Sequence, residues 1–151
     1  MNSNSRDMEY NLAMKNLFNG EILDRASAAR QIGHLKDSRA SNLLIRALKS
    51  EEDSIVINRI IEAMGEIKDA KATMAIVEIL KKELDKQDFE QDKRLLFLIV
   101  ESLMKIGDKR ALEHLGLLLE FCEGDIKNFT EEALECIDPN WKENLTGNSK
   151  I

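Results

Sequence analysis

Three stretches of this chain share one pattern: IGHLKDSRA at residues 32–40, MGEIKDAKA at 64–72 and LMKIGDKRA at 103–111. Each stretch opens with apolar residues, continues with a lysine or glycine and an aspartate, and ends in a basic residue and an alanine. The copies lie 32 and then 39 residues apart, and a fainter fourth copy, LECIDP at 134–139, follows 31 residues after the third. A period of about 20–50 residues is typical of repeat arrays.

Apolar residues on both sides of each copy recur at helical spacing. In the first repeat they include Ala28, Ile32 and Leu35 before the turn, and Leu44 and Leu48 after it. Spacings of three and four residues place apolar side chains on one face of a helix. The second and third repeats show the same arrangement. Each repeat is therefore predicted to be a hairpin of two amphipathic helices.

The turn of each hairpin contains an aspartate, namely Asp37, Asp69 or Asp108. At this position a carboxylate can accept hydrogen bonds from the free N–H groups that open the second helix. Because capping explains both the residue type and its position, we assign these aspartates a structural role and not a catalytic or metal-binding one. Only the third repeat has a glycine, Gly107, before the aspartate. A left-handed residue is therefore expected there and not at the lysines of the other two repeats.

The pattern resembles the HEAT-like repeats of the phycobilisome-lyase type. The residues that carry the resemblance are RxxAAxxIGxLxDxRA at 25–40 and EAMGxIxD at 62–69, and it extends over about residues 22–138. It implies an all-α fold, an α-α superhelix in the form of a short right-handed solenoid of about three and a half helical hairpins. It also implies that the second helices line the concave side.

The chain has 151 residues, of which 43% are hydrophobic, and contains a single proline. This length predicts one domain, placed at residues 6–142 between a disordered N-terminus at 1–5 and a flexible tail at 143–151. The polar start of the chain leads into no apolar segment, so a cytoplasmic protein is expected. The longest apolar run, residues 95–100, is far shorter than the roughly 20 residues of a membrane span, and no membrane partner is expected.

The net charge of −6 argues against nucleic acid as a partner, because phosphate binding relies on basic side chains. Between Glu120 and Glu143 there are eight acidic residues and two lysines, whereas residues 36–50 carry a local positive excess. Recognition of DNA lesions, which some HEAT-like glycosylases perform, would need a basic groove with aromatic side chains. The acidic balance and the single tryptophan make this alternative the least favoured.

Candidate catalytic and metal-binding residues are few. A zinc or iron site needs three or four converging ligands, and the chain has only two histidines, His34 and His114. Cys122 and Cys136 form no CxxC pair, and phosphate-binding and nucleophile-elbow motifs are missing from the sequence. We therefore expect a non-enzymatic protein without a metal, a cofactor or catalytic residues.

The expected function is protein binding through the concave face, as an adaptor or scaffold that is a monomer or a homodimer. The candidate positions lie on the second helices, off the apolar stripe that faces the core. Leu43, Met74 and Leu117 among them would form an apolar patch suited to a partner. We refer to these positions as the second-helix residues: Arg39, Asn42, Leu43, Arg46, Lys71, Met74, Glu78, Arg110, His114 and Leu117.

An alternative function follows from the resemblance alone. A bilin lyase, or a related ligand chaperone, would present a tetrapyrrole to an acceptor cysteine of another protein. Arg39, Arg46 and Arg110 would then contact the propionate groups of the tetrapyrrole. The low aromatic content of 5% argues against a large flat ligand.

Overall fold

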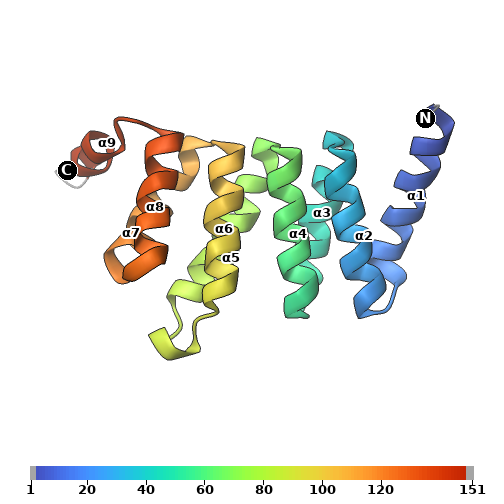
Figure 1. Ribbon diagram of the computed structural model, residues 1–151, viewed down its shortest axis with the longest axis horizontal. Coiled ribbons are helices and arrows are strands. Elements are labelled where there is room, and N and C mark those ends of the chain that lie inside the picture. Colours follow the sequence, from blue (N-terminus) through green and yellow to red (C-terminus); the bar gives the residue numbers. More distant parts are fainter. Residues whose placement is uncertain (1–2, 149–151) are drawn as a thin grey trace. The chain divides into compact units, whose positions relative to one another are not determined.

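The structure, a computed structural model, describes residues 3–148, with the side chains of residues 3, 89 and 146–148 left out of the description. Within these residues it contains helices and turns and no strand, which confirms the predicted all-α class. The described residues fall into two compact units, one up to Ala72 and one from Thr73 onward. Figure 1 labels the helices of both units.

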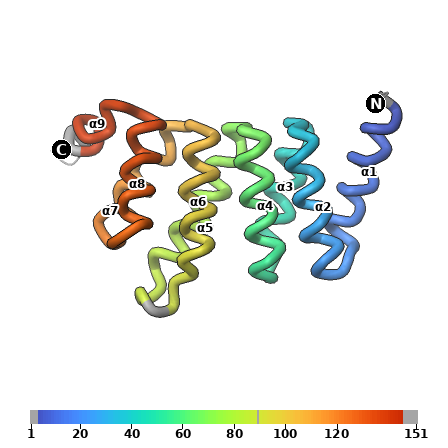
Figure 2. Tube along the Cα trace, in the orientation of Figure 1, coloured from blue at the N-terminus to red at the C-terminus, as the bar shows by residue number. Residues whose placement is uncertain are grey.

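The first unit contains four α-helices in two layers. Helices α2 and α4 lie side by side and form its largest contact, while α1 packs on α2 and α3 packs on α4 (Figure 1). The chain reverses between α1 and α2 (Figure 2). The elements are α1 (Ser3–Asn19), α2 (Ile22–Leu35), the 3-10 turn η1 (Ser38–Ala40), α3 (Ser41–Ser50), α4 (Ser54–Ile67) and the 3-10 turn η2 (Ala70–Ala72).

The second unit repeats this arrangement. Helices α6 and α8 lie side by side, α5 and α7 form the other layer, and α9 packs against α7 and α8. The elements are α5 (Thr73–Leu84), the 3-10 turn η3 (Asp88–Glu90), α6 (Lys93–Ile106), the 3-10 turn η4 (Lys109–Ala111), α7 (Leu112–Phe121), α8 (Gly124–Ile137) and α9 (Trp141–Asn148).

Close approach of α2 and α4 depends on a glycine. A Cβ atom added to Gly33 would lie 2.9 Å from the Cα of Ala63 and 3.0 Å from its Cβ. Ile32, Ile60 and Ile61 are completely buried around this contact region of the two helices. Gly33, in the first of the three repeated stretches, is therefore required because the backbones of α2 and α4 meet there.

The backbone of the hairpin turns corrects one expectation. Gly107 is left-handed, with φ +75°, as predicted, but Lys36 and Lys68 are left-handed as well, with φ 51° and 61°. All three residues end a first helix, and their N–H groups donate to carbonyl oxygens of the preceding turn, those of Gly33, Met64 and Leu103. The helix end fixes the conformation, and a lysine adopts it at an energetic cost.

The turn aspartates act as predicted. Asp37, Asp69 and Asp108 each accept a hydrogen bond at 3.0 Å from the backbone N–H two residues later, and this opens a 3-10 turn that continues into the second helix. Asp138 makes the same contact with the N–H of Asn140 at 2.9 Å. The fainter fourth copy therefore shares the aspartate contact of the other turns, although no left-handed residue directly precedes it and no 3-10 turn follows it within the described residues.

Two of these aspartates also interact with the preceding repeat. The backbone N–H of Lys71 lowers the pKa of Asp69 most, and the buried Ser41 hydroxyl helps to lower it further. The buried Thr73 hydroxyl also helps to lower the pKa of Asp108 without making a hydrogen bond within the described residues, and there the hydrogen bond from the Arg110 side chain has the larger effect. Ser41 and Thr73 hold equivalent positions, each the first residue of a second helix. We call this pairing the hydroxyl–aspartate link.

Helix α9 completes a fourth hairpin with α8. Trp141 is buried and its Nε1 donates to Glu135 Oε2 at 2.9 Å, as α9 packs against α7 and α8. Leu145 reaches Gly116 of α7, where an added Cβ would lie 2.9 Å from the Leu145 Cδ1. Both boundaries of the predicted domain thus fall inside helices, because α1 begins at Ser3 and α9 continues to Asn148.

Across residues 3–148, none of the helices combines the length and the apolar composition that crossing a membrane requires.

Candidate functional site

The structure places all ten second-helix residues on or directly before second helices, five in each unit. Arg39, Asn42, Leu43, Arg46 and Lys71 belong to the first unit, and Met74, Glu78, Arg110, His114 and Leu117 belong to the second. Eight of them are exposed, while Leu43 and His114 are half-buried. Each set is thus available on its own unit.

In the first unit, the basic second-helix residues lie against aromatic rings of α1. The guanidinium carbon of Arg39 is 5.0 Å from the Tyr10 ring centroid, and that of Arg46 is 5.9 Å from the Phe18 ring centroid. These are cation–π distances. Sequence analysis missed Tyr10 and Phe18, because only the packing of α1 beside α3 brings them close. The spacing of residues within α1 gives no signal of this contact.

Arg39 and Arg110 are bound by the aspartates of their own turns. Arg39 Nη2 lies 2.6 Å from Asp37 Oδ2, and Arg110 Nη2 lies 2.6 Å from Asp108 Oδ2. The arginine side chains hold the pKa values of both carboxyl groups below their usual range. These two arginines therefore stabilise the turn first and present only part of their donor capacity to a partner. The ion pairing could not be read from the capping pattern alone.

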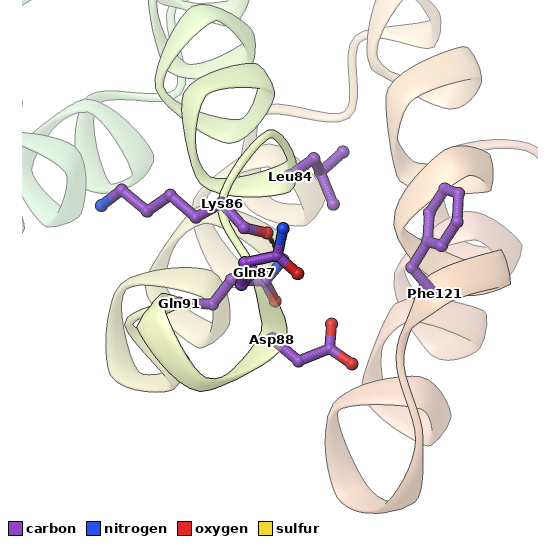
Figure 3. Close-up of a pocket in the computed structure, with 6 residues that line it drawn as sticks. All are labelled: Leu84, Lys86, Gln87, Asp88, Gln91 and Phe121. Atoms are coloured by element: carbon purple, nitrogen blue, oxygen red, sulfur yellow. Dashed lines mark hydrogen bonds between the residues drawn. The ribbon is translucent and has the colours of Figure 1, made fainter.

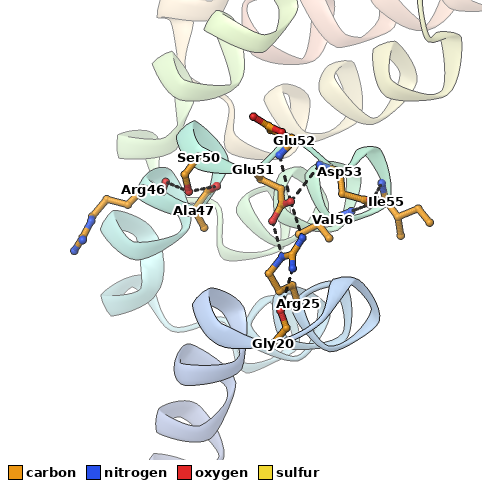
Figure 4. A network of polar contacts seen from close by, with 10 residues as sticks. All are labelled: Gly20, Arg25, Arg46, Ala47, Ser50, Glu51, Glu52, Asp53, Ile55 and Val56. Atoms are coloured by element: carbon orange, nitrogen blue, oxygen red, sulfur yellow. Dashed lines mark hydrogen bonds and ion pairs between the residues drawn. The ribbon is translucent and has the colours of Figure 1, made fainter.

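Arg46 differs from these arginines because it extends into solvent. Figure 4 shows its side chain directed away from the neighbouring polar network. Its stack on Phe18 uses one face of the guanidinium group and leaves the N–H donors at the edge accessible. Of the two second-helix arginines of the first unit, Arg46 is therefore the better placed to contact an acidic partner.

In the second unit, the exposed second-helix residues are two apolar side chains, Met74 and Leu117, and two charged ones, Glu78 and Arg110. Met74 on α5 is 39% exposed and Leu117 on α7 is 40% exposed. His114 on α7 is half-buried and has a buried Nδ1 without a hydrogen-bond partner among the described residues. Phe121, at the end of α7, is 66% exposed and was not predicted as a site residue. Its place as the last residue of an apolar helix was the one signal available.

A polar network in the first unit has a structural role (Figure 4). Arg25 donates to both carboxylate oxygens of Glu51, at 2.9 and 3.0 Å, and to the carbonyl of Gly20 at 2.9 Å. Burial has the largest single effect on Glu51 and would raise its pKa, but the hydrogen bond and charge of Arg25, together with the backbone N–H groups of Asp53 and Glu52, outweigh burial, and the pKa is lowered. The network joins the α1–α2 turn to the α3–α4 loop, and its charges are already satisfied.

The histidine, cysteine and acidic side chains are the ones that bear on metal binding and on thiol chemistry. No group of three or more histidine, cysteine or acidic residues converges as a metal site within the described part of the chain. Burial raises the pKa of the Cys122 thiol, so the reactive thiolate is disfavoured at neutral pH. The expectation of a protein without a metal or catalytic residues stays a prediction.

Comparison with protein families gives the decisive match. A family described as HEAT repeats matches residues 16–91, half of the chain. The chain belongs to the HEAT-repeat family. The matched segment of this HEAT-repeat protein runs from the end of α1 to the loop after α5 and includes the first two turn aspartates. A comparison with curated proteins found no match.

HEAT repeats generally mediate protein–protein interactions. In this HEAT-repeat protein, the exposed second-helix residues supply a basic surface in the first unit and apolar side chains in the second. Such a combination of charged and apolar groups suits a protein ligand more than a small molecule.

Proposed function

We propose that this HEAT-repeat protein is a non-enzymatic module that binds a protein partner through its second-helix residues. The observation that carries the proposal is the exposure of Met74 and Leu117, two large apolar side chains on second helices. Exposed apolar residues on a binding face gain free energy when a partner covers them. The concave position of this face, and its use by an adaptor in the cytoplasm, belong to the same proposal.

Charge orients the partner in this proposal. Arg46 and its neighbours on the first unit attract an acidic segment, whereas the acidic residues between Glu120 and Glu143 repel one. Complementary charges raise the rate of association and select the orientation of binding more than they add affinity. A partner that carries both an acidic segment and exposed apolar side chains therefore fits best.

The test is affinity capture with a matched control. Tagged wild-type protein, a Met74→Asp, Leu117→Asp variant and a control variant are compared in native lysate. The control is Leu23→Asp, Ile55→Asp, which changes two other exposed apolar residues, on the first helices α2 and α4. We expect a stoichiometric partner with the wild type and with the control, and its loss with the second-helix variant.

The opposite result would contradict the proposal. If the first-helix control loses the partner while Met74→Asp, Leu117→Asp retains it, then the first helices bind the partner. Helical circular dichroism of each variant shows whether its fold is intact.

Enrichment of a chromophore without a protein would favour the bilin-presenting function of the phycobilisome-lyase type. The ion pairs of Arg39 and Arg110 with their own aspartates weigh against that function, because it needs these arginines for propionates.

A further inference from the structure

A pocket of about 390 Å³ lies in the second unit, and none of the ten second-helix residues lines it (Figure 3). Its lining comes from the end of α5, from the loop between α5 and α6, and from the end of α7. This volume is at the lower end of the range of ligand pockets, about 300–1,000 Å³. The lining residues are Leu84, Lys86, Gln87, Asp88, Gln91 and Phe121.

The apolar wall of the pocket is incomplete. The Phe121 ring faces the pocket from α7, opposite the loop, and Leu84 lies on the α5 side (Figure 3). Phe121 is 66% exposed, so its ring has an open face that an apolar side chain of a ligand can cover. An isolated aromatic ring beside a pocket is an anchor point of the kind found at protein interfaces.

A buried carboxylate holds the loop wall in place. Glu83 is 4% exposed, and its carboxylate accepts from Lys86 Nζ at 2.6 Å and from the Asp92 N–H at 3.0 Å. The Gln91 side chain donates to the Lys86 carbonyl at 3.3 Å. The pocket therefore exists before a ligand arrives, which lowers the entropic cost of binding.

The electrostatic character of the pocket is negative. Lys86 neutralises Glu83, whereas the Asp88 carboxylate points into the pocket toward α7 (Figure 3). Helices α5 and α7 both end at the pocket, and each helix C-terminus carries a partial negative charge of about half a unit. Glu120 and Glu123 flank Phe121 in the sequence and are exposed. A cationic ligand is therefore favoured here.

From these observations we propose that the pocket binds a basic segment of a partner protein. A leucine or aromatic side chain of the segment packs on Phe121 and Leu84, and a lysine or arginine next to it pairs with Asp88. The class of ligand rests on the proposed protein-binding function, but the binding residues are separate from the second-helix residues. The HEAT-repeat protein would thus have two surfaces of opposite preference, one for acidic segments and one for basic segments.

A library of random peptides displayed on phage, selected against the wild-type protein, provides the probe. We expect the selected peptides to combine lysine or arginine with leucine or an aromatic residue. The affinity of each synthetic peptide is then measured by fluorescence polarisation, and we expect it to fall as the salt concentration rises, because exposed charge pairs are screened.

Two pocket variants and two controls locate the binding site. Phe121→Asp and Asp88→Lys should each weaken peptide binding by at least about tenfold, by removing the apolar anchor or reversing the charge. Glu90→Lys makes the same charge change in the same loop at a residue that does not line the pocket, and Leu23→Asp changes an exposed apolar residue of the first unit. Both controls should bind as the wild type does.

The inference is overturned if no peptide is selected, if the selected peptides are acidic, or if Phe121→Asp and Asp88→Lys bind them unchanged. Peptides that lose binding only to the Met74→Asp, Leu117→Asp variant would support the proposed function and contradict the pocket. Conversely, loss of binding to Phe121→Asp with full binding to Met74→Asp, Leu117→Asp supports the pocket independently of the captured partner. Melting temperatures of all variants confirm that each one is folded.

Discussion

Lys36 and Lys68 hold left-handed backbone conformations that glycine adopts at no steric cost. For an L-residue this conformation costs roughly 1–2 kcal/mol. A glycine removes this cost, but it loses more backbone entropy on folding, so the net gain in stability is smaller. We expect Lys36→Gly and Lys68→Gly each to raise the free energy of unfolding by up to about 1 kcal/mol. Urea denaturation measures the change.

Alanine at Gly107 tests the same argument in reverse. Gly107 has φ +75°, and a Cβ there would meet no other atom within 4 Å, so that backbone strain is the main effect. Gly107→Ala should therefore lower the free energy of unfolding. If it is neutral while the two lysine variants are neutral too, the left-handed residues of the turns carry no significant strain.

Two glycines inside helices should respond to alanine in opposite ways. Gly33→Ala places a Cβ against the backbone of Ala63, which cannot move aside, so we expect a loss of about 1–3 kcal/mol from overpacking. Gly116→Ala meets only the end of the Leu145 side chain, which can rotate, and gains up to about 1 kcal/mol of helix propensity. Thermal denaturation of both variants checks the pair. Equal changes in stability would show that helix propensity, and not the space around each glycine, determines the effect of alanine.

These residues show what a single sequence can and cannot reveal. The capping role of Asp37, Asp69 and Asp108 was predictable because the contact is local, between residues two positions apart. The left-handed lysines were not, since residue preference at that position opposes what the helix end imposes. The Arg25–Glu51 pair joins residues 26 positions apart, and only the packed helices define it.

At the scale of the elements, the hairpin turns make the stability of the protein depend on pH. The side chain of Arg110 holds the pKa of Asp108 below its usual range, and the N–H of Lys71 does the same for Asp69. A carboxyl group whose pKa is lower in the folded state stabilises the fold above its unfolded pKa, about 3.9, and this stability is lost as the pH falls toward the folded pKa.

Asp108→Asn tests this coupling, because an amide retains an acceptor for the turn but carries no charge. We expect the variant to be less stable than the wild type by up to about 1 kcal/mol at pH 7, the upper end for an exposed ion pair. The difference should shrink as the pH falls from about 5 to 3. Urea denaturation at a series of pH values measures it. A difference that stays constant over this range would assign the loss to changed packing.

The helix order and the hairpin boundaries followed from the apolar spacing and the turn aspartates. Helix α9 did not, because its eight residues are mostly polar and its stability depends on Trp141 and Leu145 packing against other helices. The aromatic residues of α1 near Arg39 and Arg46 were missed for the same reason. Contacts between helices, more than patterns within them, account for what the sequence analysis left out.

At the scale of the whole molecule, charge is unevenly distributed along the chain. The proposed partner contact at Arg46 predicts that Arg46→Glu weakens partner binding several-fold, mainly by slowing association. Arg30→Glu is the matched control, because Arg30 is exposed on the first helix α2. Surface plasmon resonance with the captured partner at low and high salt separates the association rate from the dissociation rate. Equal effects of both variants would mean that net charge alone attracts the partner.

The hydroxyl–aspartate link has a consequence for building longer arrays. Residues 41–72 begin with Ser41 and contain its partner Asp69, and residues 73–111 begin with Thr73 and contain its partner Asp108. Each segment is thus a cassette that brings both halves of its own link. The next segment begins with Leu112, which has no hydroxyl, and there the carboxylate of Asp138 binds the side chain of Asn144 within the last hairpin. In-frame duplication of either cassette should therefore extend the protein and give each new turn aspartate a hydroxyl partner. Duplication of residues 112–140 would add a turn aspartate without supplying such a hydroxyl.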